Sequence, residues 1–183
     1  MMGTMPVAVC RSGVGRRGIG GILAAPLWEG LLGLLGGLGF LGLLGLFDIV
    51  MGKYFTIDEL CRSNTADKMG IRNVPSADIK EKLEVLINEL LDPVREAWGK
   101  PIKVNSGYRC PKLNKAVGGV ANSQHMKGEA ADLNAGSKWE NKALFELIRK
   151  NYEFDQLIDE SGFAWVHVSY VKKNRRQVLH LKK

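Results

Sequence analysis

The chain has 183 residues, of which 45% are hydrophobic and 25% are charged, and its formal net charge is +7. This length fits one domain with an extension. The three cysteines, Cys10, Cys61 and Cys110, are an odd and sparse set, which argues against a disulfide framework. The positive net charge suits an anionic polymer as a partner. Because no nucleic-acid motif accompanies it and aromatic residues are not interleaved with the basic ones, we expect no nucleic-acid partner.

Residues 1–52 differ in composition from the rest of the chain. Between Gly30 and Phe47 only glycine, leucine and phenylalanine occur, and glycine recurs at every third position up to Gly45. An uncharged segment of this length is a candidate membrane anchor over residues 30–47, and the arginines before it favour a cytoplasmic N-terminus. The glycines weaken this interpretation, since they lower both apolar character and helix propensity.

Two other interpretations of this segment stay open. Met51 stands directly before the ordinary globular sequence, so the true start could be Met51, with residues 1–50 wrongly joined to the gene. A cleavable signal peptide is the third interpretation, although no A-x-A-like site follows the apolar run. We therefore divide the chain into a hydrophobic N-terminal segment, residues 1–52, and one domain, residues 53–183.

The domain begins with predicted helices. Thr56-Ile-Asp-Glu59 is a capping box that opens a short helix. Apolar residues at helical spacing predict a long amphipathic helix over 77–98 that begins after Ser76, and Pro93 is expected to kink it. A second capping box at Ser137 opens a later helix. A further short helix is expected over residues 110–117.

Strands follow the helices along the chain. Short runs rich in β-branched and aromatic residues predict them over residues 103–105, 130–133, 154–158, 165–170 and 177–181. The basic run over residues 172–176 reads as a solvated hairpin turn. Helices first and clustered strands later predict an α+β domain with an antiparallel sheet.

The most informative pattern is the string S-x-H-x-x-G-x-A-x-D over residues 123–132, followed by W-V-H over residues 165–167. His125 and Asp132 are too far apart for one helical turn, so this is not a helical zinc motif. Gly128 indicates a tight turn between them, because glycine tolerates positive φ. On the strand that follows, Ala130 and Asp132 share a face, and the small Ala130 leaves room for a metal.

His125, Asp132 and His167 supply two imidazoles and one carboxylate. This ligand set can hold a catalytic zinc ion with one coordination position open for water. On the strand that carries His167, Trp165 and Ser169 share its face and the alternate residues would be buried. His180 has no comparable context, and we expect a surface or structural role for it. The sequence therefore predicts one zinc ion and a zinc hydrolase.

These motifs resemble those of the zinc D-Ala-D-Ala carboxypeptidases and their M15 peptidase relatives, which include phage endolysins. The resemblance extends to S-G-Y-R-C-P over residues 106–111, to Asn114 and to F-D-Q-L-I over residues 154–158, so it covers roughly residues 53–171. It implies a small α+β zinc peptidase domain of the D-Ala-D-Ala carboxypeptidase and hedgehog type. It also implies zinc on His125, Asp132 and His167, and a peptidoglycan peptide as substrate.

Two substrate-binding roles follow from the same resemblance. Arg109 stands where the family places an arginine near the substrate, and its guanidinium could hold a peptide carboxylate through two parallel hydrogen bonds. A surface arginine in a turn is the alternative. Ser123 could hydrogen-bond the substrate or steady its loop.

The catalytic base is where the sequence departs from the family. Several members carry glutamate three residues before the last histidine, and here that residue is Ala164. A zinc hydrolase still needs a group that takes the proton from the attacking water. The nearest carboxylates are Glu160, which we prefer, and Asp159. Both could instead be solvated carboxylates of a turn.

The expected function is hydrolysis of peptidoglycan stem or cross-link peptides, as a D,D-carboxypeptidase or an endopeptidase. The alternative is a zinc-containing cell-wall-binding module without catalysis, which the missing glutamate at position 164 keeps open. We expect a monomer. The resemblance and the N-terminal segment together predict the cell envelope, or, without residues 1–52, the cytoplasm until release, as for a phage lysin.

Overall fold

The structure is a computed structural model that describes residues 52–181. The hydrophobic N-terminal segment, and with it the anchor, the alternative start and the signal peptide, lies outside the described residues. No helix within the described part combines the length and the apolar character that a membrane span requires.

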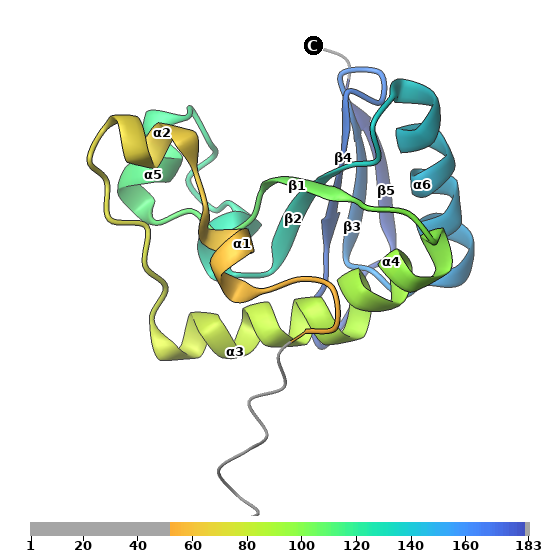
Figure 1. The fold of residues 1–183 in the computed structure, drawn as a ribbon, viewed down its shortest axis with the longest axis horizontal. Coiled ribbons are helices and arrows are strands. Elements are labelled where there is room, and N and C mark those ends of the chain that lie inside the picture. The colour runs from red at the N-terminus through yellow and green to blue at the C-terminus, as the bar shows by residue number, and fades with distance from the viewer. Residues whose placement is uncertain (1–51, 182–183) are drawn as a thin grey trace, which may run out of the picture. The chain divides into compact units, whose positions relative to one another are not determined.

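Six α-helices and five strands make up the described domain (Figure 1). The helices are α1 (Ile57–Cys61), α2 (Asn64–Lys68), α3 (Ala77–Leu86), α4 (Asp92–Trp98), α5 (Pro111–Ala116) and α6 (Lys138–Asn151). The strands are β1 (Lys103–Ser106), β2 (Ala130–Asn134), β3 (Gln156–Glu160), β4 (Trp165–Ser169) and β5 (Gln177–Leu181). The α+β class predicted from the sequence is confirmed.

The local signals of the sequence explain how the helices begin. The Thr56 hydroxyl accepts a hydrogen bond from the Glu59 amide at 3.1 Å, and the Ser137 hydroxyl accepts one from the Glu140 amide at 3.2 Å. The N-cap hydrogen bond of each predicted capping box is therefore confirmed. Ser76 precedes α3 as expected, but its hydroxyl pairs with the Asp78 carboxylate instead of capping the backbone.

The long helix predicted over residues 77–98 is α3 and α4 joined without a break. A π-helical turn, Ile87–Leu91, connects them and ends two residues before Pro93. Pro93 has no N–H to donate to the turn before it, and the wider turn accommodates this loss. The kink expected at Pro93 stays a prediction, and the structure shows a local change of helix type beside this residue.

The sheet has the strand order β1-β2-β4-β3-β5. All neighbouring pairs are antiparallel except β3 and β5, which are parallel. The prediction of an all-antiparallel sheet is therefore wrong for its last strand, and residues 172–176 are not a hairpin turn. Because β2 and β3 already flank β4 on both sides, the chain leaving β4 must cross β3 and pair at the sheet edge.

The two faces of the sheet have different environments. One face packs against α3, α4 and α6, and its side chains join the main hydrophobic core: Ala131, Leu133, Leu157, Val166 and Val168. Successive side chains of a strand point to opposite faces. The alternate positions, which include Asp132 and His167, therefore project away from this core.

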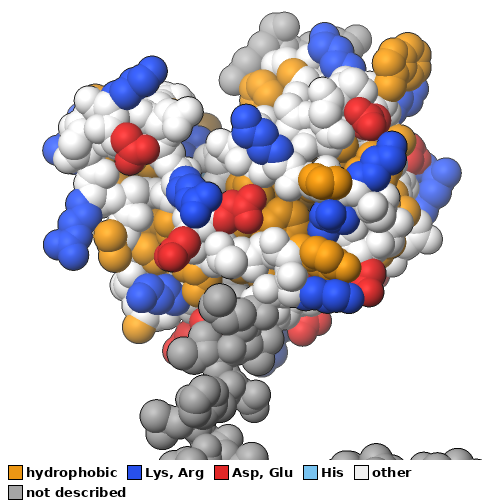
Figure 2. Space-filling view, viewed as in Figure 1, with side chains coloured by type: hydrophobic (Ala, Val, Ile, Leu, Met, Phe, Trp, Pro, Cys, Tyr) orange, Lys and Arg blue, Asp and Glu red, His pale blue; other side chains and the backbone are white. Residues whose placement is uncertain are grey.

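Charged side chains are distributed over the surface without a dominant patch on the face shown in Figure 2. Lysine and arginine side chains alternate there with aspartate and glutamate, and the face is hollowed between the side that carries α2 and α5 and the side that carries the sheet.

Candidate metal centre

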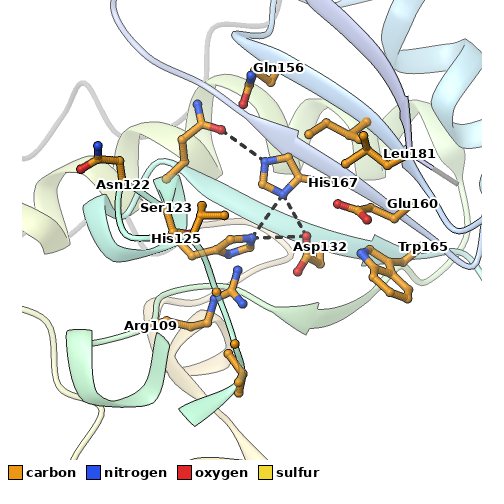
Figure 3. Close-up of a pocket in the computed structure, with 16 residues that line it drawn as sticks. Arg109, Asn122, Ser123, His125, Asp132, Gln156, Glu160, Trp165, His167 and Leu181 are labelled. Carbon is orange, nitrogen blue, oxygen red and sulfur yellow. Dashed lines mark hydrogen bonds and ion pairs between the residues drawn. The ribbon is translucent and has the colours of Figure 1, made fainter. Parts of the chain in front are cut away.

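Three side chains meet on the face of the sheet opposite the core. The His125 Nε2 and Asp132 Oδ1 atoms are 3.3 Å apart, and the His167 Nδ1 and Asp132 Oδ1 atoms are 3.0 Å apart. The two histidine nitrogens are 3.2 Å from each other. Figure 3 shows the three side chains converging. Each offers one ligand atom, and these atoms all lie within 4.8 Å of one another.

The backbone brings the three residues together in a simple way. Asp132 and His167 are direct partners in the antiparallel pairing of β2 with β4. His125 belongs to a 3₁₀ turn, Gln124–Lys127, that ends at Gly128. Gly128 has φ of 72°, so the glycine predicted to reverse the chain there does adopt the left-handed conformation. The turn thereby places His125 beside the Asp132–His167 pair.

A backbone carbonyl fixes the orientation of His125. Its Nδ1 lies 2.7 Å from the carbonyl oxygen of Gly107. A carbonyl can only accept, so Nδ1 carries the proton and Nε2 presents a lone pair to Asp132 and His167. A side chain at Gly107 would bring a Cβ within 2.4 Å of the Leu60 carbonyl oxygen, so only glycine fits. Sequence reasoning missed this role, although Gly107 lies within the S-G-Y-R motif.

The electrostatics of the cluster favour metal ligation. Burial lowers the pKa of the His125 imidazole, although the Asp132 carboxylate opposes this shift. Burial alone would raise the pKa of the Asp132 carboxyl, but His125 and His167 hold that pKa well below its usual range. At neutral pH the site therefore contains a neutral His125 and an ionised Asp132, which are the forms that bind metal.

The donor set fits zinc. Two imidazole nitrogens and one carboxylate oxygen are ligands that zinc accepts, and three protein ligands leave a fourth position for water or substrate. No other group of three His, Cys, Asp or Glu side chains with this geometry occurs in residues 52–181. One zinc ion is therefore the cofactor that this site accommodates.

The cluster lies at the wall of a cavity of about 390 Å³. The cavity is also lined by Arg109, Ser123 and Glu160, so three of the predicted site residues join the predicted ligands there. In Figure 3, Arg109 and Glu160 approach the cluster from opposite sides of the view. A positive and a negative side chain thus flank the metal ligands.

The two candidate bases point in opposite directions. Glu160 lies on the cavity face of β3 with Ile158, which is the residue paired with His167. Asp159 is buried on the other face, where it accepts a hydrogen bond from the Phe163 amide and lies 3.3 Å from His180 Nδ1. The structure therefore brings Glu160, but not Asp159, to the metal ligands. His180 has a structural contact here, as expected.

Arg109 is half-buried and has no ion pair with any described residue. Its Nε is buried without a hydrogen-bond partner among residues 52–181. Burial lowers the pKa of its guanidinium, although the charges of Asp132 and Glu160 oppose that shift. A buried donor without a partner is costly unless a ligand satisfies it, so Arg109 is suited to bind an anionic group in the cavity.

Ser123 lines the cavity, and Asn114 holds a loop beside it. Ser123 is buried, lines the cavity and precedes the 3₁₀ turn that carries His125. Asn114 is also buried, and its amide donates to the Val120 carbonyl oxygen at 2.9 Å, which holds the loop beside the cavity. Cys110 packs against the hydrophobic core as a free thiol, in agreement with the packing role expected for it.

Two histidines and an aspartate at the cavity wall of this α+β domain form a candidate zinc site. The comparison with protein families gives the particular class: a family model described as Peptidase M15 matches residues 53–169. The chain belongs to the M15 peptidase family. Its similarity to the zinc D-Ala-D-Ala carboxypeptidase of Streptomyces albus G is 44% identity over 85 residues, which is 46% of this chain. The match covers 32% of the relative's length.

Proposed function

We propose that this protein is a zinc-dependent peptidase that hydrolyses peptide bonds of peptidoglycan, with D,D-carboxypeptidase activity. The observation that carries the proposal is the convergence of the His125–Asp132–His167 cluster, Glu160 and Arg109 in one cavity. The name of the similar Streptomyces protein supports the substrate class.

His125, Asp132 and His167 would hold the zinc ion. Zinc bound by such ligands acts as a Lewis acid toward a carbonyl group and makes water a better nucleophile. The chain supplies the geometry: two ligands belong to neighbouring strands and the third to a turn closed by Gly128. A site built on such elements is already arranged before substrate binds.

Glu160 is the group that takes the proton from the attacking water and passes it to the leaving amine. Ile158 is paired with His167, so Glu160 and His167 are diagonal neighbours on one sheet face. Such neighbours are about 7–8 Å apart, a span that a long side chain and one water can bridge. This position replaces the glutamate that other family members carry where this chain has Ala164.

Arg109 would bind the terminal carboxylate of the substrate. The absence of an ion pair within the described domain leaves its guanidinium available to a ligand. A planar guanidinium matches a carboxylate with two parallel hydrogen bonds. This arrangement favours a carboxypeptidase over an endopeptidase, because only the former must recognise a free carboxylate beside the scissile bond.

A non-catalytic cell-wall-binding module is the second candidate, and Ala164 is the observation that favours it. Such a module needs no carboxylate in position to accept a proton. Glu160 in the cavity counts against this candidate. The two functions differ in whether peptide bonds are cut.

Digestion of purified sacculi tests the proposal. We expect release of D-alanine, loss of this release with a chelator, and recovery when zinc is restored. New amino and carboxyl termini identify the bond that is cut. Binding to sacculi without any new termini would instead support the non-catalytic module, and internal cleavage without D-alanine release would support the endopeptidase.

A further inference from the structure

Gln124 links the metal ligand His167 to an ion pair outside the cluster. Its side-chain oxygen Oε1 lies 3.3 Å from His167 Nε2, and its amide nitrogen Nε2 donates to Asp155 Oδ2 at 2.7 Å. Asp155 is buried and in turn accepts two hydrogen bonds from the Arg175 guanidinium, at 2.7 and 2.6 Å. Four side chains thus form one chain of hydrogen bonds that ends at a metal ligand.

The chemistry of Arg175 sets the direction of every hydrogen bond in this chain. A guanidinium is always protonated in proteins and only donates. The Asp155 carboxylate therefore accepts hydrogen bonds from the guanidinium. Because an ionised carboxylate has no hydrogen to donate, it must also accept the hydrogen bond from Gln124. The Gln124 amide must then turn its NH₂ group toward Asp155 and its oxygen toward His167.

The orientation of Gln124 determines which nitrogen of His167 carries the proton. An amide oxygen only accepts, so His167 Nε2 must donate and bears the hydrogen. Nδ1 then presents its lone pair to Asp132 and His125, from which it is separated by 3.0 and 3.2 Å. The carbonyl of Gly107 does the same for His125 at 2.7 Å, through the opposite ring nitrogen.

We propose that Gln124, held by the Asp155–Arg175 ion pair, is a positioning residue that fixes His167 in the tautomer and orientation required to bind zinc. Histidine ligands of metals commonly donate their second N–H to such an acceptor, which also makes them better ligands. The proposal rests on the zinc-dependent function of the same site and extends it to three residues outside the ligand set.

The neighbouring arginine provides a matched control. Arg176 forms an ion pair with Glu153 and donates to the Arg149 and Tyr152 carbonyls. Its guanidinium lies over the Phe154 ring, and it has no hydrogen bond or ion pair with Asp155 or Gln124 among the described residues. Arg175 and Arg176 are adjacent, exposed and each paired with a carboxylate. Only Arg175 belongs to the series of hydrogen bonds that reaches His167. Comparing substitutions of the two arginines therefore distinguishes an effect on His167 from the general effect of removing a surface charge.

The experiment measures the zinc dissociation constant of the full chain by competition with a chromogenic chelator. Gln124→Met removes both hydrogen bonds at nearly constant volume, and we expect zinc binding to weaken about 10- to 100-fold. Arg175→Gln should weaken it in the same direction but less, because Asp155 remains to orient the amide. Arg176→Gln should bind zinc like the wild type.

Proton NMR of the zinc-loaded protein supplies a second measurement. In the wild type, the His167 Nε2–H should give a slowly exchanging signal, because it donates to Gln124. Gln124→Met should lose this protection. Unfolding of the zinc-free variants shows whether each protein folds, and Arg175→Gln, changed at an exposed residue, decides the question if Gln124→Met does not.

Two results would overturn the proposal. Zinc affinity of Gln124→Met equal to that of the wild type would show that the amide does not prepare His167. Equal zinc affinity of Arg175→Gln and Arg176→Gln would show that the Asp155–Arg175 ion pair does not help to position His167. A wild type that binds zinc and cuts no peptidoglycan would refute the proposed peptidase function, yet it would leave this inference standing.

Discussion

Replacement of Arg109 tests whether the cavity recognises a terminal carboxylate. Among residues 52–181 no carboxylate forms an ion pair with Arg109, and its buried Nε has no hydrogen-bond partner. A substrate carboxylate would satisfy this donor and neutralise the half-buried charge. Arg109→Ala removes the contact, while Arg109→Lys keeps a positive charge and loses the planar pair of donors.

The magnitude follows from the strength of charge-assisted hydrogen bonds. Hydrogen bonds to charged groups contribute about 1.5–3 kcal/mol, and each 1.36 kcal/mol changes a rate by about tenfold. We therefore expect Arg109→Ala to lower kcat/KM for a peptide ending in a free carboxylate by about 10- to 150-fold. Arg109→Lys should fall between the wild type and Arg109→Ala.

The assay compares kcat/KM for a free-acid peptide and its C-terminal amide. We expect the wild type to prefer the free acid and Arg109→Ala to lose most of this preference. Arg72→Ala is the control, since Arg72 is exposed and does not line the cavity. A wild-type ratio near one that does not change in Arg109→Ala would refute the carboxylate contact and favour an endopeptidase.

The remaining predictions concern the base, the metal, pH and the core. Glu160→Gln should retain zinc and lower kcat by about 10²–10⁴, whereas Asp159→Asn should stay active; the reverse result would contradict our assignment. Asp132→Ala should abolish zinc uptake in a titration, because the ligand set is incomplete. Arg175 holds the pKa of Asp155 below its ordinary value, mainly through their hydrogen bonds. The stability that the ionised Asp155 contributes is therefore complete above about pH 4 and is lost as the pH falls further. The difference in unfolding free energy between the wild type and Asp155→Asn, measured by denaturant unfolding, should shrink over the same pH range. Leu86→Ala should cost about 2–5 kcal/mol of unfolding free energy, measured in the same way, because Leu86 is fully buried.

The cluster of His125, Asp132 and His167 could be predicted because local sequence places its residues. His125 and Asp132 lie on either side of one glycine turn, and His167 lies on a strand whose alternate residues are apolar. Each of these features is encoded within a few residues. To predict the cluster, it was therefore enough to expect that the two strands pair so that Asp132 lies opposite His167, as it does.

The strand order and the choice between two carboxylates depend on information outside any short segment. Nothing in the sequence of β5 states that both sides of β4 are already occupied. Asp159 and Glu160 are adjacent, so strand alternation allows only one of them to face the cavity. Which one does so follows from the pairing of Ile158 with His167. The hydrogen bond from Gln124 to Asp155 was not predicted, because the two residues lie 31 positions apart and no local pattern links them.

The sheet separates the chemistry of this protein from its stability. The residues of β2 and β4 that face the helices are alanine, leucine and valine with at most 1% exposure, while Asp132 and His167 on the opposite face are polar and line the cavity. Asp132→Ala removes a carboxylate from the cavity face and does not change the side chains of the core face. Leu86→Ala opens a void in the hydrophobic core, on the other side of the sheet from Asp132. Because Leu86 lies in the core and Asp132 lies on the opposite face of the sheet, we expect the effects of substituting them on the free energy of unfolding to add. Strong coupling between Leu86→Ala and Asp132→Ala in a double-mutant cycle would refute this separation.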